Sequence, residues 1–260
     1  MERALKVIAL PLDVAWADRD ENLIAAETMM RHMGRGCDVF VLPELFTTGF
    51  VSDVSVLTGM ADSDTSHPVL DAVRHMAATV NAAVCGSLAW RSDDGAFYNR
   101  CFFVEPDGET AYYDKQHLFA LSAERRIYTP GTRPVPVVRF RGWNIAMAIC
   151  YDVRFPECLR NFPARYDLLL IPANWPDARR YAWEHLLIAR AIENQAYVVG
   201  ANRSGHDDFG TYGETTHIYD YLGMDVGVVC AEGPCAGAVE AVLSLDALRD
   251  ARKGFPVLIP

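Results

Sequence analysis

Three short and almost wholly apolar runs of the sequence each end close to a polar or reactive side chain. They are DVFVL at 38–42, NIAMAI at 144–149 and DLLLIP at 167–172. Strands that are apolar on both sides are typical of a sheet covered on both faces, so these runs predict the buried strands of a layered α/β fold. Glu44, Cys150 and Asn174 follow them. Because ligands bind at the carboxyl edge of such sheets, we expect the strand ends to mark a functional site.

The rest of the chain alternates between strand-like and helical patterns. Apolar patterns predict strands at 5–14, 37–46, 82–90, 99–109, 110–119, 143–150, 166–175 and 196–205, with a turn at 106–108 between two of them. Apolar residues at helical spacing predict helices at 20–34, 69–80, 155–162 and 178–195, and short strands are expected to finish the chain. Because no linker, fixed-period repeat or low-complexity block interrupts the 260 residues, the sequence predicts a single domain at 1–260.

The charge balance limits the class of partner. The chain carries 24 Lys and Arg against 34 Asp and Glu, a formal net charge of −10, which argues against a nucleic-acid surface. An anionic substrate would therefore need a local cation. The first apolar segment is too short and too interrupted by charge for a signal peptide or a membrane span, so we expect a cytoplasmic protein that makes no membrane contact.

Cysteine and histidine usage indicates neither a disulfide framework nor a metal centre. The seven cysteines include no C-x-x-C pair, and several lie inside apolar strands, so we expect reduced thiols. The seven histidines show no H-x-x-x-H or H-E-x-x-H spacing. The sequence thus predicts no metal site.

Cys150 is a candidate nucleophile that needs a base, because a thiol with an ordinary pKa of about 8.5 is only slightly ionised near neutrality. His117 is the nearest histidine candidate by motif. Glu44 is the more interesting base, because its apolar neighbours in LPELF would raise the pKa of its carboxyl group toward the range of a general acid and base. Lys115 would then hold an oxyanion.

Each of these residues taken alone has a more ordinary interpretation. Free cysteines are commonly packed in cores, glutamates commonly lie on surfaces, and lysines are nearly always solvated. An apolar flank on both sides is nevertheless an awkward place for an unpaired Glu44 charge. The ordered set, rather than any one residue, favours a catalytic interpretation.

Seven segments in order carry a family resemblance over most of the chain. They are LPELFTTGF, YNRCFFVEPDG, YDKQHLF, ERRIYTPG, CYDVRFPE, YDLLLIPANWP and ARAIENQAYVVGANRSG. Together they resemble the nitrilase superfamily of carbon-nitrogen hydrolases, and within it the omega-amidase-like branch, whose members hydrolyse the terminal amide of α-keto acid amides such as α-ketoglutaramate. The resemblance implies a four-layer αββα sandwich, assembly as homodimers or larger homo-oligomers, and no cofactor.

The same resemblance implies a catalytic triad of Glu44, Lys115 and Cys150, with Glu124 as a second glutamate six residues before the proline of YTPG. Glu44 would take the thiol proton, and Cys150 would attack the amide carbon. Lys115 and the backbone N–H of Tyr151 would stabilise the oxyanion, and a thioester would remain after ammonia leaves. In isolation, Glu124 also fits an exposed turn in which a neighbouring arginine pairs with it.

The expected substrate-binding residues have competing interpretations. Arg154 would bind a substrate carboxylate, or would form an i,i+3 ion pair with Glu157. Tyr151, Phe119 and Trp175 would line the pocket, although aromatic residues more often fill cores.

One segment departs from the family. Where many members have a Gly-x-Ser step ahead of Asp-Pro, the stretch 211–223 has Glu214, Thr216 and Tyr221 in place of Gly, Ser and Pro. This leaves three functional hypotheses open. The first is an omega-amidase acting on a small dicarboxylic monoamide. The second is an amidase, N-carbamoyl hydrolase or nitrilase for another substrate. The third is a non-enzymatic interaction subunit on the same fold.

Overall fold

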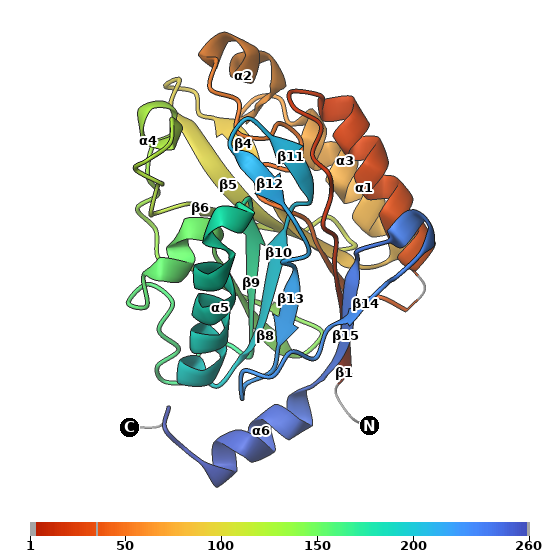
Figure 1. Ribbon diagram of the computed structural model, residues 1–260, viewed down its shortest axis with the longest axis vertical. Coiled ribbons are helices and arrows are strands. Elements are labelled where there is room, and N and C mark those ends of the chain that lie inside the picture. Colours follow the sequence, from red (N-terminus) through yellow and green to blue (C-terminus); the bar gives the residue numbers. More distant parts are fainter. Residues whose placement is uncertain (1–3, 35, 259–260) are drawn as a thin grey trace.

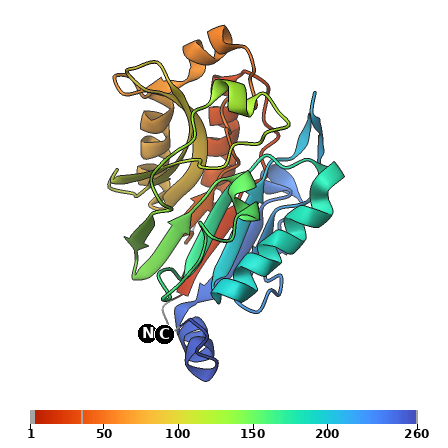
Figure 2. The same cartoon turned by 90° about the vertical axis from the view of Figure 1, so that its left-hand side faces the viewer.

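Two β-sheets pack face to face between two layers of helices. The computed structural model describes residues 4–34 and 36–258, so residues 1–3, 35 and 259–260 of the predicted domain lie outside the described residues. Helices α1 (Arg19–Met33) and α3 (Pro68–Val80) cover the outer face of one sheet, and α5 (Arg180–Asn194) covers the outer face of the other (Figure 2). The chain therefore has the αββα architecture that the resemblance implies.

The first sheet has parallel strands at its centre and antiparallel strands toward its edges. Its order is β14 (Val228–Val229), β15 (Val239–Ser244), β1 (Ala4–Ala9), β2 (Val39–Val41), β4 (Ala83–Arg91), β5 (Phe97–Val104) and β6 (Thr110–Asp114), and β3 (Asp62–Ser63) also pairs with β4. Strands β1, β2 and β4 run parallel. The turn predicted at 106–108 joins the antiparallel pair β5 and β6.

The second sheet has the same plan. Its order is β13 (His217–Tyr219), β10 (Tyr197–Asn202), β9 (Leu168–Ala173), β8 (Trp143–Met147) and β7 (Val137–Phe140), with β8, β9 and β10 parallel. The apolar run 38–42 thus belongs to one sheet, whereas 144–149 and 167–172 belong to the other. Their carboxyl ends still meet, because the Glu44 N–H donates to the Ala173 carbonyl across the sandwich at 3.3 Å.

The long helices follow the sequence signals closely. Pro68 lies in the first turn of α3, where a missing N–H costs nothing, and Asn81 ends the helix in the left-handed conformation. Helix α5 buries Trp183, Leu187 and Ala191, spaced four residues apart, against the second sheet. The helices predicted at 20–34, 69–80 and 178–195 are confirmed within two residues at each end.

Shorter elements complete the chain (Figure 1). They are helices α2 (Val54–Met60), α4 (Glu124–Ile127) and α6 (Leu245–Gly254), the hairpin strands β11 (Gly205–Asp207) and β12 (Gly210–Tyr212), and 3₁₀ turns at Cys150–Arg154, Asp177–Arg179 and Gly233–Cys235. The short strands expected toward the end of the chain are present as β11 to β15, but helix α6 follows β15 as the last element. Helix α6 has a Ser244 cap whose hydroxyl accepts from the Ala247 N–H.

The helix predicted at 155–162 is wrong. The chain instead forms the 3₁₀ turn Cys150–Arg154 and then irregular turns up to β9. Pro156 disfavours helical backbone at Phe155, where the 3₁₀ turn ends. The Asn161 side chain donates to the Tyr166 and Asn194 carbonyls and so takes the place of helical backbone bonds.

Most of the predicted strands are shorter than expected, and in two of them the difference positions the site. The strand predicted at 37–46 ends at Val41, and the one predicted at 110–119 ends at Asp114. Glu44 and Lys115 therefore lie on loops at the edge of the sandwich rather than within strands. All seven cysteines are free thiols, as predicted. Among the described residues, no helix has the length and apolar character needed to cross a membrane.

Candidate active site

Cys150 lies at the start of the 3₁₀ turn that follows β8, and its backbone has a positive φ of 43°. A non-glycine residue adopts this conformation only when its surroundings enforce it. Asp152 supplies much of that enforcement, since its carboxylate accepts from the Ile149 N–H at 3.1 Å and from the Tyr113 hydroxyl at 3.0 Å. The ring of His117 binds the same carboxylate at 2.8 Å. Asp152 is thus the partner that the structure gives to His117.

A buried lysine lies between two buried glutamates. The Lys115 Nζ atom is 2.7 Å from Glu44 Oε1 and 2.7 Å from Glu124 Oε1. Lys115 and Glu124 are each 1% exposed and Glu44 is fully buried, so none of the three is a solvated surface charge. Glu124 Oε2 also accepts from the Phe119 N–H at 2.7 Å. The structure therefore pairs Glu124 with Lys115 rather than with a neighbouring arginine.

Asn99 joins the two carboxylates, and sequence reasoning did not single it out. Its Nδ2 atom donates to Glu44 Oε1 at 2.8 Å and to Glu124 Oε1 at 3.2 Å. Asn99 lies on β5 within YNRCFFVEPDG, one of the segments that carry the resemblance. Asparagine is depleted in strand interiors, which is the signal that would have identified it.

The loop that carries Glu44 is fixed from both sheets. Leu45 has a positive φ of 48°, and its N–H donates to Ser87 Oγ at 2.9 Å. The second carboxylate oxygen of Glu44 accepts from the Asn174 N–H at 3.0 Å. Asn174 follows β9 in the other sheet, so the loop and the carboxylate of the general-base candidate are held from both halves of the sandwich, by the Ser87 hydroxyl and the Asn174 N–H.

Gly131, from the YTPG segment, positions Lys115. Its N–H donates to the Lys115 carbonyl at 2.9 Å, and a Cβ atom at this position would lie 2.0 Å from the Asp114 carbonyl oxygen. Only glycine allows this approach of the two backbones. The Lys115 N–H donates in turn to the Asn99 carbonyl at 2.9 Å.

Burial and neighbouring charges shift the pKa values of the three central groups. Burial raises the pKa of Glu44, the Lys115 ammonium opposes that rise, and the Glu124 carboxylate adds to it. Burial alone would lower the pKa of Lys115, but Glu124 and Glu44 outweigh it and hold that pKa well above its ordinary value. Burial, and then the charge of Glu44, raises the pKa of the Cys150 thiol well above its ordinary value.

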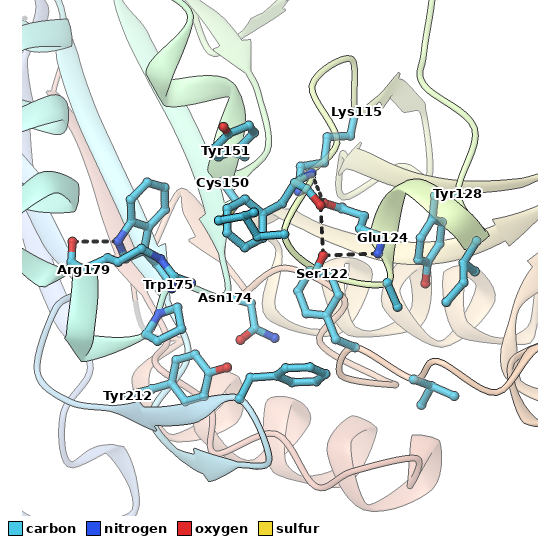
Figure 3. Close-up of a pocket in the computed structure, with 18 of the residues that line it drawn as sticks. Lys115, Ser122, Glu124, Tyr128, Cys150, Tyr151, Asn174, Trp175, Arg179 and Tyr212 are labelled. Atoms are coloured by element: carbon cyan, nitrogen blue, oxygen red, sulfur yellow. Dashed lines mark hydrogen bonds and ion pairs between the residues drawn. The ribbon is translucent and has the colours of Figure 1, made fainter.

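The site opens into a pocket at the carboxyl ends of the strands (Figure 3). Cys150, Lys115 and Glu124 line it, together with Tyr151, Phe119, Arg154 and Trp175, all of which the sequence predicted for the site. The Phe119 and Tyr151 rings meet edge to face with centroids 5.2 Å apart. The Trp175 ring N–H donates to the Arg179 carbonyl at 2.9 Å, as the dashed line in Figure 3 shows.

Two arginines line this pocket without an acidic partner. The Arg154 guanidinium lies 5.0 Å from the Trp175 ring centroid, and the Arg179 guanidinium lies 5.1 Å from that of Phe119. Neither arginine forms an ion pair within residues 4–34 and 36–258, and the Arg154–Glu157 pair is not formed there. Sequence reasoning missed Arg179. The local cations that an anionic substrate would need are therefore present.

The atypical segment supports the pocket from behind. Asn202 Oδ1 accepts from the Trp175 N–H at 2.7 Å, and Asn202 Nδ2 donates to the Trp175 carbonyl at 2.8 Å and to Thr215 Oγ1 at 2.7 Å. Thr216 Oγ1 bonds to both the N–H and the carbonyl of Asn202, at 3.1 and 3.0 Å. These threonines thus position Trp175 through Asn202.

The other two departures from the family lie outside the pocket lining. Glu214 is exposed, and its carbonyl accepts from the Arg180 guanidinium at 2.9 Å. The Tyr221 ring packs against Tyr197, with centroids 5.5 Å apart. The extra carboxylate at Glu214 therefore does not line the pocket. Within the part of the chain that the structure describes, no group of three or more His, Cys, Asp or Glu side chains is arranged to hold a metal ion.

The fold and this group of residues define a carbon-nitrogen hydrolase. Residues 7–233 match the family of that name, and the chain belongs to it. Omega-amidase YafV of Yersinia enterocolitica is 41% identical over 253 residues, covering 97% of this chain and 94% of the relative. Omega-amidase YafV of Escherichia coli K12 is 39% identical over 97% of this chain and 94% of its own. The 2-oxoglutaramate amidase of Bacillus subtilis is 32% identical over 96% and 95%.

Solved structures agree with this assignment. A CN-hydrolase superfamily protein of Xanthomonas campestris, with an arsenic adduct in its active site, is 34% identical and superposes with a TM-score of 0.88 over 98% of this chain and 96% of its own. Nit3 of Saccharomyces cerevisiae, a nitrilase-superfamily member, shares the fold with a TM-score of 0.86 at 20% identity, over 98% and 95% of the two chains. The predicted membership of the nitrilase superfamily and of its omega-amidase-like branch is confirmed.

Proposed function

We propose that this protein is a cysteine-dependent omega-amidase, which releases ammonia from the terminal amide of a small α-keto acid amide such as α-ketoglutaramate or α-ketosuccinamate. The observation that carries the proposal is the buried Glu44–Lys115–Glu124 group beside Cys150, at the end of a pocket lined by two unpaired arginines. The similarity to omega-amidases and a 2-oxoglutaramate amidase supports this choice of substrate.

Glu44 acts as the base in the first step. Its raised pKa favours proton uptake, and its charge acts on the Cys150 thiol, whose pKa it raises. Because the thiol pKa is also raised, the proton passes from Sγ to Glu44 as Sγ bonds to the amide carbon. The carbonyl π electrons move to oxygen and give a tetrahedral oxyanion.

Lys115 and the backbone N–H of Tyr151 stabilise that oxyanion. An ammonium has three N–H donors, and two of those on Lys115 are taken by Glu44 and Glu124. The third remains for the oxyanion, since Lys115 lines the pocket. Glu124 positions Lys115 and the substrate amide. Such a preorganised donor is worth roughly a hundredfold to a thousandfold in rate.

Collapse of the oxyanion expels ammonia. Glu44 returns its proton to the leaving nitrogen, the C–N bond breaks, and a thioester remains on Cys150. Water then gives a proton to Glu44 and attacks the thioester, and the acid leaves as Sγ regains the proton. These steps use side chains of this chain and water, and they require no cofactor.

The remaining pocket residues bind the rest of the substrate. Arg154 and Arg179 attract its carboxylate, because both guanidinium groups face the pocket without an acidic partner. Tyr151, Phe119 and Trp175 pack against its carbon chain. We further propose that residues 1–260 act as one domain, since one apolar core joins both sheets. We also propose a cytoplasmic homodimer or larger homo-oligomer, as the family resemblance implies.

Ammonia release from a substrate panel tests the function. The panel contains α-ketoglutaramate, a neutral aliphatic amide, an N-carbamoyl amino acid and a nitrile. We expect α-ketoglutaramate to show the highest kcat/KM. A higher value for another compound would replace the omega-amidase proposal by the corresponding amidase, carbamoylase or nitrilase. No turnover of any compound by the folded protein would favour the interaction-subunit alternative.

A further inference from the structure

Asn174 presents a buried carboxamide with no partner. Its side chain is 6% exposed, lines the pocket, and has neither Oδ1 nor Nδ2 hydrogen-bonded to any described residue. In Figure 3 the amide points into the pocket, on the side where Tyr212 lies. A buried polar group without a partner is costly, so each one in a native protein calls for an explanation.

The backbone of Asn174 is fixed on both sides, so the carboxamide is held in place. Its N–H donates to Glu44 Oε2 at 3.0 Å. The next residue, Trp175, is clamped through both its N–H and its carbonyl by the Asn202 side chain. The unpaired amide is therefore preorganised for a ligand rather than left over from a loose loop.

Other buried polar atoms near the site have a different character. Asn99 lacks a partner only at Oδ1, since its Nδ2 serves the two carboxylates. The Tyr128 hydroxyl lacks a partner and feels the charges of Glu124 and Glu44. Among the described residues that line the pocket, Asn174 alone has two polar side-chain atoms without a partner.

The position of Asn174 matches one part of the proposed substrate. Its backbone N–H binds Glu44, the proposed base, and its side chain lines the same pocket as Cys150, Arg154 and Arg179. Its carboxamide is thus available to a substrate whose amide lies at Cys150 and whose carboxylate is attracted by these cations. In an α-keto acid amide the ketone is the group that can meet this carboxamide, because it stands between the amide carbon and the carboxylate.

We propose that Asn174 is a specificity-determining residue whose Nδ2–H donates to the 2-oxo group of the substrate. This inference rests on the proposed function, because it assigns the ketone of the same substrate. A site with a preorganised donor rejects an analogue that lacks the matching acceptor, since the donor then stays buried and unpaired. The pocket therefore selects α-keto acid amides over plain dicarboxylic monoamides.

A pair of substrates that differ only at this group tests the proposal. Glutaramate has the chain, amide and carboxylate of α-ketoglutaramate, with a methylene in place of the ketone. The quantity measured is the ratio of kcat/KM for α-ketoglutaramate to that for glutaramate. We expect a ratio of about 10 to 100 for the wild type, from the cost of one unpaired buried donor. In Asn174→Ala we expect it to fall to within about threefold of unity.

Two further variants test whether a change in the ratio comes from the contact with the ketone. Asn174→Ser keeps a shorter donor, so we expect an intermediate ratio, and it serves as the second variant should the alanine protein fold poorly. Arg179→Gln is the matched control, because it removes a cation that attracts the carboxylate present in both compounds. We expect it to lower both kcat/KM values by the same factor and to leave the ratio unchanged.

The outcomes separate this inference from the function on which it rests. An unchanged ratio in both Asn174 variants overturns the role of Asn174 in binding the ketone. Any loss of activity would then affect both substrates equally, as expected if Asn174 only positions Glu44 and Cys150. A wild type that prefers glutaramate overturns it as well. A wild type that turns over neither compound but hydrolyses another amide overturns both the inference and the omega-amidase proposal.

Discussion

Removing the charge of Glu124 should move the acid limb of the pH profile to lower pH. In the account above, Glu44 must be ionised to accept the thiol proton, so kcat/KM rises with pH through the pKa of Glu44. That pKa is raised by burial and by Glu124. Both Oε1 atoms lie 2.7 Å from Lys115 Nζ, so they are no farther apart than twice that distance. Glu124→Gln keeps the shape of the side chain and removes its charge.

The size of the effect follows from that separation. Two unit charges about 5 Å apart repel by about 3 kcal/mol at an effective dielectric constant of about 20, and one pKa unit corresponds to about 1.4 kcal/mol. Because each charge is spread over two oxygens, we expect a shift of about one to two pH units in the variant. Lower overall activity is also expected, since the amide of the variant has a single acceptor oxygen and cannot serve Lys115 and the Phe119 N–H through separate oxygens, as the carboxylate does.

The assay is ammonia release at low substrate concentration from about pH 4 to pH 9. Glu214→Gln is the control, because it removes the same charge from an exposed residue outside the pocket lining. The acid limb of its pH profile should lie at the same pH as that of the wild type. An acid limb that stays within about 0.3 pH units in Glu124→Gln would refute the reasoning. Glu44 would then not be the titrating base, or would not feel its neighbour.

Three other perturbations have definite expected results. Lys115→Met should lower kcat by about a hundredfold to a thousandfold and also lower the melting temperature, because two buried carboxylates lose their cation; a kcat within tenfold of the wild type would contradict this. Gly131→Ala should lower the free energy of unfolding by about 1–3 kcal/mol, because the added Cβ would clash with the Asp114 carbonyl. Gly59→Ala is the control, since there is open space around Gly59 and its stability should not change. Calorimetry measures the stability of both variants against the wild type. Arg154→Gln should lower kcat/KM about tenfold for an anionic amide and leave kcat/KM for a neutral amide nearly unchanged. High salt should have the same selective effect on the wild type. Equal losses on both amides would exclude carboxylate binding by Arg154.

Local patterns were enough to predict much of the fold. Helices α1, α3 and α5 follow from apolar spacing, and the buried strands follow from their continuous apolar runs. The helix expected at 155–162 was lost because the Asn161 side chain and the backbone turn at Pro156 satisfy groups that a helix would otherwise pair. Which sheet a strand joins is a long-range property, so only the resemblance supplied the αββα layering.

The site was predictable to the extent that its residues follow strands or lie in ordered motifs. Glu44 and Cys150 stand just past apolar strands, whereas Lys115 needed the motif order to distinguish it from a solvated lysine. Asn99 and Arg179 could not be assigned their roles in this way, although an asparagine inside a strand is a signal that would have drawn attention to Asn99. Asn99 acts through bonds to two carboxylates that come from distant loops, and Arg179 matters because no acidic side chain among the described residues pairs with it. Both properties exist only in the folded chain.

The most direct test of the central claim is to trap the acyl group on Cys150. Wild type and Cys150→Ala, both shown to be folded, are mixed with α-ketoglutaramate, quenched in acid during steady-state turnover, digested and analysed by mass spectrometry, with ammonia measured in parallel. The account predicts an acylated Cys150 peptide in the wild type, no such adduct in the variant, and a fall in ammonia release of several orders of magnitude. Ammonia release by Cys150→Ala at a rate near that of the wild type would contradict it.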